Sequence, residues 1–281
     1  MTSRGNAKAR ADRACVVYIT DGRPDDQCRM VWSLRSLLRN APSGYDVFVL
    51  SDAPVDGVRL SLSRDIGNVG FTHVSDMYPV LQDAGLSRDG WNRQWPFEVL
   101  YRLGIPLHPV FAEYDRALYL DTDTVVLSDR VVDFMQADLS GFEVGGVPDT
   151  AQEAHGRISA VLYDDLPAEH AERLVADRGQ ALFTRSYVNA GVLLFNLREI
   201  RRALPWYKER LSMFWAAECR GKMGFLDQDF VNVMMRVRSD FSLVFNWFNV
   251  CGSEADSCVI RHFCARRYAD MARCALERGL L

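Results

Sequence analysis

One short stretch constrains the fold more than any other: a strand-like apolar run that ends in two aspartates. Leu118 to Leu120 are apolar and aromatic, and the run is too short for a helix, so the pattern predicts a buried strand. Asp121 and Asp123 follow it directly. Two carboxylates at the end of such a strand are costly unless a cation meets them. Because ligands in open α/β sheets bind just beyond the carboxyl ends of strands, we expect a binding site there.

An Asp-x-Asp sequence can offer oxygens to a hard divalent cation, and that cation can also hold a diphosphate. The alternative is a plain turn whose two side chains are solvated. A calcium-binding EF-hand loop is excluded, because it would need Gly where Val126 stands and Glu where Val132 stands. The stretch alone therefore leaves a metal site and a turn both open.

Strand-like runs alternate with helical patterns along the chain, which predicts one α/β domain with a mostly parallel, mixed sheet flanked by helices. The expected strands are Cys15–Thr20, Tyr45–Leu50, Phe71–Val74, Leu118–Leu120, Phe142–Val147, Val188–Phe195, Phe241–Phe245 and Val259–Phe263. The expected helices end at Asn40 and near Leu103, and cover roughly 198–218 and 226–236.

Three segments stand apart from this regular pattern. Residues 1–13 are polar and basic and predict a flexible N-terminal arm before a domain over 14–268. Residues 150–186 are polar and helix-leaning, which predicts an insertion or lid over the strand ends. Residues 269–281 predict a basic amphipathic C-terminal helix.

Composition narrows the class of protein. The net charge is −4 and no Lys/Arg-rich stripe dominates, which argues against nucleic acid as a partner. Seven cysteines at irregular spacing, after a polar N-terminus without an apolar core, predict reduced thiols and a cytoplasmic location. No apolar run approaches the ~18 residues that span a bilayer, so we expect at most contact with a membrane surface.

Three cysteines and a histidine could in principle form a zinc site: Cys251, Cys258, His262 and Cys264. The gap between the first two is wider than the usual two to four residues, and the segment around the last three is strand-like. We therefore do not expect zinc.

Four motifs in a fixed order identify the family that the chain resembles. They are ALYLDTDTVVL, YVNAGVLLFNL, FLDQDFVN and a late Ile-Arg-His-Phe that contains His262. Together they resemble glycosyltransferase family 8, which includes bacterial lipopolysaccharide α-galactosyl- and α-glucosyltransferases and glycogenin. The resemblance covers about residues 14–268 and implies a GT-A fold, Rossmann-like and single-domain.

The resemblance also implies an activity. The implied enzyme is a hexosyltransferase. It moves a hexose, such as glucose or galactose, from a UDP-linked or other nucleotide-diphosphate sugar to a saccharide, glycolipid or other hydroxyl acceptor. The family uses Mn²⁺ or Mg²⁺ and retains the α configuration. We expect the acceptor to be chosen by residues 150–186 and by the region around Trp247.

Individual roles follow only from positions that match the family motifs. The matched metal ligands are Asp121, Asp123 and His262. The matched donor-binding residues are Asp21, Arg102, Thr122, Asn189, Gly191 and Arg267. The matched residues around the reacting sugar carbon are Asp149, Asp227 and Gln228.

Each role has a structural alternative. His262 could be a satisfied core histidine, and Arg102 could form a salt bridge on a helix surface. Asp149 could be a turn aspartate, Gly191 could mark a bulge, and Asp227 with Gln228 could form a helix N-cap.

Two departures from the family pattern matter. After the first strand the family has an acid–Asn–Tyr run whose tyrosine stacks on uracil, whereas this chain has Asp21 but no tyrosine before Pro24. Near the C-terminus the family has His-x-x-Gly and then a lysine on the diphosphate. This chain has Arg266 or Arg267 there, and either could replace that lysine.

Two other functions compete with the transferase. A metal-dependent nucleotide-sugar phosphohydrolase or nucleotidyltransferase also uses Asp-x-Asp, but usually on the first strand, where this chain has only Asp21. A non-catalytic nucleotide-sugar binder is the other.

The C-terminal helix could lie on an anionic membrane surface, or its apolar face could pack on the domain.

Overall fold

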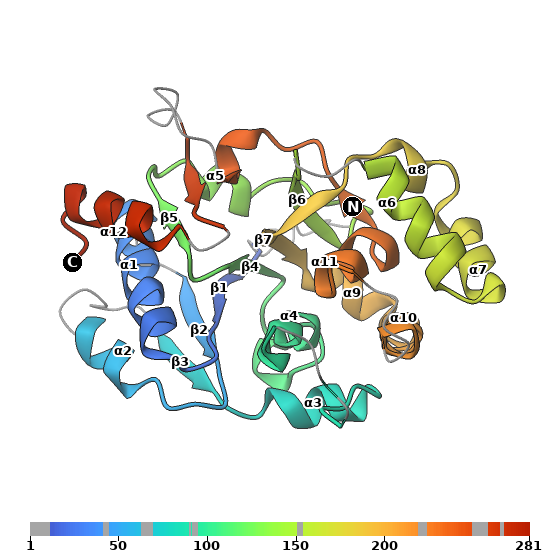
Figure 1. Cartoon of the computed structure of the whole chain (residues 1–281), viewed down its shortest axis with the longest axis horizontal. Helices are drawn as coiled ribbons and strands as arrows, with labels where there is room; N and C mark the ends of the chain where they lie inside the picture. Colours follow the sequence, from blue (N-terminus) through green and yellow to red (C-terminus); the bar gives the residue numbers. More distant parts are fainter. Residues whose placement is uncertain are drawn as a thin grey trace, which may run out of the picture.

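A central sheet with helices on both faces forms the body of the protein (Figure 1). The computed structural model describes residues 12–41, 45–62, 70–89, 91, 95–150, 154–218, 224–248, 258–264 and 267–281. The predicted arm over residues 1–13 thus lies almost entirely outside the described residues. Among the described residues, no helix is long and apolar enough to cross a membrane.

The strands are β1 (Ala14–Ile19), β2 (Asp46–Leu50), β3 (Phe71–Val74), β4 (Arg116–Leu120), β5 (Thr124–Val126), β6 (Val144–Pro148), β7 (Val188–Asn196), β8 (Val237–Arg238), β9 (Trp247–Phe248) and β10 (Ile260–His262). The α-helices are α1 (Pro24–Asn40), α2 (Asp56–Leu62), α3 (Met77–Asp83), α4 (Tyr101–Gly104), α5 (Val131–Met135), α6 (Ala154–Ala160), α7 (Ala168–Arg178), α8 (Ala181–Thr184), α9 (Leu197–Arg202), α10 (Leu204–Glu218), α11 (Asp227–Asp229) and α12 (Tyr268–Glu277). Short 3₁₀ and π turns are η1 (Phe97–Leu100), η2 (Pro109–Phe111), η3 (Val161–Asp165), η4 (Phe230–Met234) and η5 (Leu243–Phe245).

The main sheet has seven strands in the order β3-β2-β1-β4-β7-β6-β8. All neighbours pair in parallel except β7, which runs antiparallel to both β4 and β6. The predicted mostly parallel, mixed α/β sheet is therefore confirmed. The reversal of β7 brings its first residues to the edge where β1 and β4 end.

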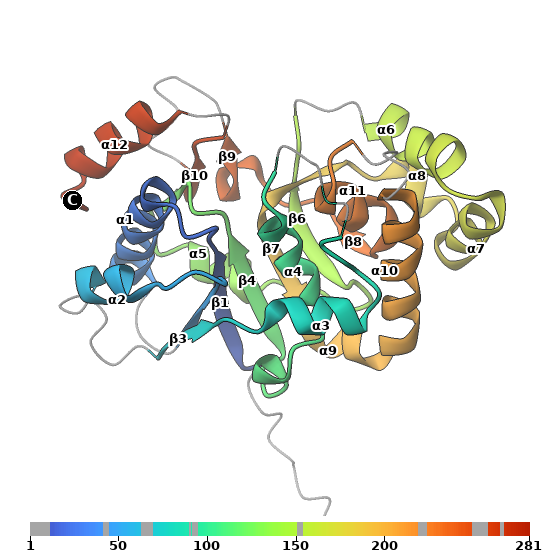
Figure 2. The same ribbon diagram turned by 60° about the horizontal axis from the view of Figure 1, so that its bottom comes forward.

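Side chains of the central strands alternate between two apolar layers. Cys15 and Val17 of β1 face one layer, and Val16 and Tyr18 face the other. The layer under α1, α2 and α5 and the layer under α3, α4 and α10 thus cover opposite faces of the sheet, as a second view also shows (Figure 2).

A second, three-stranded sheet in the order β5-β10-β9 stands beside the end of β4. β10 pairs antiparallel with β5, so that His262 lies opposite Thr124. The backbone N–H of Phe263 also donates to the carbonyl of Asp123 at 2.9 Å. This small sheet carries a residue from near the C-terminus to the aspartates that follow β4.

Some predicted elements need correction. The strand predicted at Phe241–Phe245 is wrong: Leu243–Phe245 is a 3₁₀ turn, in which the Ser242 hydroxyl accepts a hydrogen bond from Val244 N–H. The helix predicted over 198–218 is two helices, α9 and α10, with Pro205 in the first turn of the second. The strand predicted at Phe142–Val147 is observed as β6, which begins two residues later and ends one residue later.

Candidate active site

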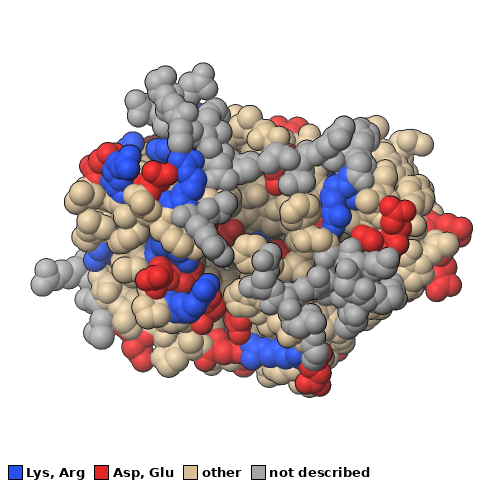
Figure 3. Space-filling model, viewed as in Figure 1, with Lys and Arg blue, Asp and Glu red and all other residues tan. Residues whose placement is uncertain are grey.

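A cavity of about 1100 Å³ opens at the edge of the main sheet where β1 and β4 end and β7 begins. It is visible as a hollow near the centre of one face, with acidic side chains inside it (Figure 3). Among the described residues that line it, six carboxylates outnumber three guanidinium groups. The carboxylates are Asp21, Asp26, Glu98, Asp121, Asp123 and Asp227, and the guanidinium groups belong to Arg23, Arg29 and Arg102. Such a surplus of negative charge suits an anionic ligand only if cations accompany it.

Three predicted metal ligands converge at the centre of this cavity. The ligand atoms of Asp121, Asp123 and His262 all lie within 4.8 Å of one another, and we call these residues the acid–histidine cluster. Nε2 of His262 is 3.1 Å from Asp123 Oδ1 and 3.6 Å from Asp121 Oδ2. On the other side of the ring, Nδ1 is 3.0 Å from Asn246 Oδ1. His262 is buried, but it does not serve only as a core residue, because Nε2 faces two carboxylates.

Electrostatics of the cluster favour a bound cation. Burial opposes the charged imidazole, but the nearby carboxylates, Asp123 foremost, outweigh it and raise the pKa of His262 well above its usual value. Burial also opposes the charge of Asp121, yet Arg102 and His262 lower the pKa of that carboxyl to about 2. Two carboxylates and an imidazole are a ligand set that fits a divalent metal, which could take the place of the imidazole proton.

Gly191 of β7 lies directly against the cluster. A Cβ atom at this position would come 2.1 Å from Cε1 of His262 and 2.7 Å from Oδ2 of Asp121. The register between β4 and β7 is regular up to Val192, but β7 is irregular against β6, because Gly146 lies opposite Leu193 and Pro148 lies opposite Val188. Gly191 lies within that irregular stretch, so close approach to the cluster and a bulge in β7 both account for the glycine.

Arg102 of α4 reaches the same cavity from the face of the sheet that α3, α4 and α10 cover. Its guanidinium donates to the carbonyl of Ala190 at 2.8 Å and to Asp121 Oδ1 at 3.3 Å. It also lies 2.9 Å from Asp227 Oδ2, close enough for an ion pair although not aligned as a hydrogen bond. Only 7% of Arg102 is exposed, so the alternative of a surface salt bridge is excluded.

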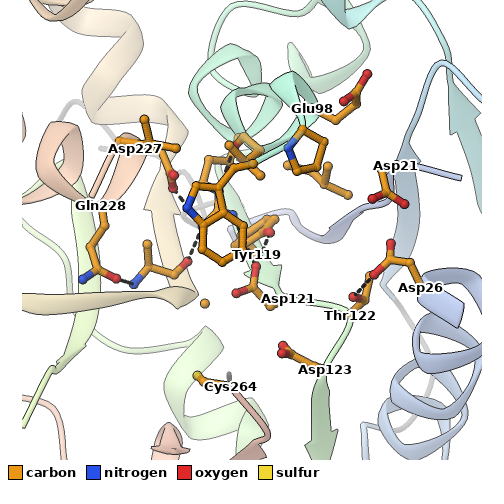
Figure 4. A pocket seen from close by; sticks show the side chains of 18 of the residues that line it. Asp21, Asp26, Glu98, Tyr119, Asp121, Thr122, Asp123, Asp227, Gln228 and Cys264 are labelled. Carbon is orange, nitrogen blue, oxygen red and sulfur yellow. Dashed lines mark hydrogen bonds and ion pairs between the residues drawn. The ribbon is translucent and has the colours of Figure 1, made fainter. Parts of the chain in front are cut away.

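The acid–amide pair Asp227 and Gln228 stands at the start of α11, on one side of the cavity (Figure 4). Gln228 Nε2 donates to Asp149 Oδ2 at 3.2 Å, and Gln228 Oε1 accepts from Ala190 N–H at 2.9 Å. Burial, opposed by Arg102, raises the pKa of Asp227 to about 6. Neither side chain caps the helix, because Leu226 holds the N-cap position with a positive φ of 51°. This strained residue aims Asp227 into the cavity.

The remaining predicted donor-binding residues divide into two groups. Asn189 lines the cavity, and its Oδ1 accepts from Asn246 Nδ2 at 3.0 Å. Asp21 and Thr122 line it too; Asp21 pairs with Arg23, and Thr122 Oγ1 donates to Asp26 Oδ1 at 2.6 Å. Arg267 is not among the described lining residues, and its guanidinium pairs with Asp270 at 2.7 Å. Arg266 and Cys251 lie outside the described residues.

Sequence reasoning missed four side chains that complete the site: Asp26, Arg29, Tyr119 and Cys264. Tyr119 O–H donates to Asp121 Oδ1 at 2.5 Å, and Cys264 Sγ is 3.1 Å from His262 Nε2. The period-two alternation of β4 could have placed Tyr119 on the same side as Asp121. No local signal distinguishes Asp26 and Arg29 from an ordinary ion pair on a helix surface.

The segment predicted as a lid is helical. α6, η3, α7 and α8 lie beside α10 and α11, and the described part of residues 150–186 contributes no lining residue. Arg157 Nε donates to Asp229 Oδ1 at 3.0 Å, which ties this segment to the helix that carries Asp227. Its role as a lid stays a prediction.

Comparison with known proteins gives a consistent result. The family model described as glycosyl transferase family 8 matches residues 81–266. The search of curated proteins found no match.

Solved structures share the fold at low sequence identity. The galactosyltransferase LgtC, in complex with donor and acceptor sugar analogs, is 19% identical with a TM-score of 0.62, over 95% of this chain and 99% of that one. Mouse xyloside xylosyltransferase 1 is 16% identical with a TM-score of 0.61, over 91% and 99%. The bifunctional glycosyltransferase WbbM is 17% identical with a TM-score of 0.64, and the match covers 97% of this chain but only 52% of WbbM.

Proposed function

The chain belongs to glycosyl transferase family 8 and is a glycosyltransferase, and from that premise we propose a more specific reaction. It is the metal-dependent transfer of a hexose from a nucleotide-diphosphate sugar, UDP-linked by preference, to a saccharide or glycolipid hydroxyl, with an α linkage. The observation that carries the proposal is the convergence of Asp121, Asp123 and His262 in the cavity that Gln228 also lines. That LgtC was solved with donor and acceptor sugar analogs supports a donor and a saccharide acceptor of these classes.

In this proposal the acid–histidine cluster holds Mn²⁺ or Mg²⁺. When bound, the metal supplies positive charge to the leaving diphosphate. Arg102 pairs with both Asp121 and Asp227 and offsets part of their negative charge. The negative charge that is left on the carboxylates attracts the metal ion. Asp21, Thr122 and Asn189 bind the donor, and Asp149 and Asp227 bind hydroxyls of its sugar.

The proposed stereochemistry rests on Gln228. A double displacement needs a nucleophile beneath the anomeric carbon. The amide of Gln228 is neutral, and both of its ends already make hydrogen bonds, to Asp149 and to Ala190 N–H. We therefore propose that the acceptor attacks on the face from which the diphosphate leaves, with the amide oxygen steadying positive charge on the sugar. NMR of the anomeric proton tests this: an α product is expected, and a β product would refute it.

A donor screen tests the function itself. The purified chain is incubated with UDP- and GDP-hexoses and Mn²⁺, Mg²⁺ or a chelator, with and without saccharide acceptors. Acceptor-stimulated, metal-dependent release of nucleoside diphosphate is expected, and Asp123→Ala should abolish it while circular dichroism stays unchanged. Release of nucleoside monophosphate would indicate the phosphohydrolase or nucleotidyltransferase class. Nucleotide-sugar binding without turnover would indicate a non-catalytic binder.

Action in the cytoplasm, at a membrane surface, also belongs to the proposal. Of the apolar residues of α12, Met271 and Ala275 are buried in the domain, as the packing alternative expects, whereas Leu276 is 65% exposed. Charged residues such as Arg273, whose side chain is 70% exposed, would add attraction to anionic lipid. Co-sedimentation with anionic vesicles that Arg273→Ser leaves unchanged would speak against that contribution.

A further inference from the structure

Arg29, on the second turn of α1, is a buried cation in the wall of the cavity that no motif pointed to. Only 7% of the residue is exposed, and it lines the cavity. Its Nη2 donates to Asp26 Oδ1 at 2.8 Å, whereas its Nε has no hydrogen-bond partner in the described part of the chain. A buried guanidinium with an unused donor is costly unless a ligand completes its pairing.

The charges of the other two arginines of the wall are met by the protein or by solvent, because Arg23 has a side chain that is 71% exposed. Arg102 meets two carboxylates and a backbone carbonyl. Arg23 holds Asp21 at 2.5 Å. Asp26, in contrast, divides its Oδ1 between Arg29 and the Thr122 hydroxyl. Of the described lining arginines, Arg29 is thus the buried one with a single, shared carboxylate partner.

Arg29 is also placed at the correct end of the site for the phosphates of a donor. The bond from Thr122 to Asp26 ties α1 to the residue between the two metal-binding aspartates. Figure 4 shows Asp26 and Thr122 across the cavity from Gln228 and Asp227, with Asp121 and Asp123 between them. A donor whose sugar lies over Gln228 and whose diphosphate meets the acid–histidine cluster would extend its phosphates toward this side.

Tyr268, at the start of α12, holds the guanidinium in place. The Cζ atom of Arg29 lies 3.9 Å from the centroid of the Tyr268 ring, which also lines the cavity. Stacking on an aromatic face fixes the plane of a guanidinium and leaves its edge available for in-plane hydrogen bonds. A planar fork of this kind matches two oxygens of a phosphate group.

We propose that Arg29 binds the diphosphate of the nucleotide-sugar donor, and that Tyr268 positions it for this task. The inference rests on the donor proposed above. It assigns to α1, near the N-terminus, the cationic role that the family pattern would place among the C-terminal arginines. Arg267 is engaged by Asp270, which is consistent with this assignment. In a cavity with more carboxylates than guanidinium groups, one divalent ion does not balance a diphosphate, so a second cation has a clear function.

The test compares ligands that differ only in phosphate. Isothermal titration of the full chain with Mn²⁺ measures the affinities of UDP, UMP and uridine, and of the guanosine series in parallel. Arg29→Gln keeps a polar side chain, although a shorter one, and removes the charge. It should weaken UDP binding about tenfold or more and leave uridine within about twofold. Arg29→Lys, which retains the charge and the pairing with Asp26 but not the fork, should lie between wild type and Arg29→Gln.

The control is Arg39→Gln, on the last turn of the same helix. Arg39 donates to the backbone carbonyls of Arg278 and Gly279, outside the cavity, so the same change of charge there should leave all three affinities unchanged. Equal UDP affinity in wild type, Arg29→Gln and Arg29→Lys would overturn the inference, as would an equal loss for UDP and uridine. If Arg29→Gln does not fold, an unchanged UDP affinity in Arg29→Lys overturns it. A wild-type chain that binds no nucleotide of either series would instead refute the proposed donor.

Discussion

Replacing Gln228 by glutamate tests the geometry of the acid–amide pair in a way that does not depend on the donor. Gln228 Nε2 lies 3.2 Å from Asp149 Oδ2, and 8% of Asp149 is exposed. In Gln228→Glu, a carboxyl oxygen replaces the N–H donor. Two like charges at this distance repel by about 5 kcal/mol at an effective dielectric constant of about 20.

The introduced carboxyl has a cheaper alternative, which is to keep its proton. Holding a proton at pH 7 on a group whose ordinary pKa is about 4.3 costs about 3.7 kcal/mol, less than the repulsion. The protonated form can also donate the hydrogen bond to Asp149 that the amide made. The free energy of unfolding of the variant should therefore be close to that of wild type in acid. At neutral pH it should be lower, by the free energy needed to keep the proton.

The sign of the pH dependence follows from linkage. Because the native variant binds one more proton than the unfolded chain above about pH 4.3, its stability falls as the pH rises. The deficit relative to wild type should grow from near zero at about pH 4 to about 3.7 kcal/mol at pH 7. Urea unfolding of metal-free protein across this range measures it, with Gln228→Ala as a control whose deficit should not change with pH. A deficit in Gln228→Glu that is constant, or larger in acid, would show that the amide does not face Asp149.

Two further predictions concern Gly191, which lies against the site, and a buried ion pair in the core. Gly191→Ala places a Cβ 2.1 Å from the imidazole of the acid–histidine cluster, so Mn²⁺ affinity should fall by about 10- to 100-fold. Titration calorimetry measures the affinity, and an unchanged circular dichroism spectrum shows that the fold persists. Undiminished affinity would contradict the prediction. Glu143→Gln breaks the ion pair with Arg210, in which each side chain is only 1% exposed, and should lower the free energy of unfolding by about 3–5 kcal/mol. In the urea unfolding experiment Glu209→Gln, which breaks an exposed pair with Arg173, should change little, and equal effects of the two changes would refute the role of burial.

Short runs in which β-branched, aromatic and other apolar residues predominate were predictable as strands in most cases. Phe71–Val74 is observed with its predicted bounds, and Val188–Phe195 is observed one residue longer as β7. Phe241–Phe245 has the same apolar character but forms no strand. Ser242 starts a 3₁₀ turn there, and Phe245 stacks on Phe134 instead of joining a sheet. An apolar run indicates burial, but only neighbouring strands decide whether it becomes part of a sheet.

Side chains of the site were predictable where they belong to a sequence motif. They were not predictable where only the tertiary structure brings them to the site. Asp121, Asp123 and His262 converge as the motif order indicated. Arg29 and Asp26 stand three residues apart, a spacing typical of exposed helical ion pairs, so nothing local reveals that both are buried. Arg29 lies against Tyr268, more than two hundred residues later in the chain, and Asp26 bonds to Thr122, which is 96 residues later. Such a contact has no signature in sequence spacing.

The three-stranded sheet that carries His262 has a consequence for the order of assembly during synthesis. Both carboxylates of the cluster leave the ribosome well before the imidazole, which follows about 140 residues behind them. Closing so long a loop costs entropy before any contact rewards it. A nascent chain that ends before β10 therefore has an acidic cavity wall but no complete metal site, so a metal that requires the full cluster would bind only after the last third of the chain has docked. Metal affinity would then report completion of the fold as well as readiness for catalysis.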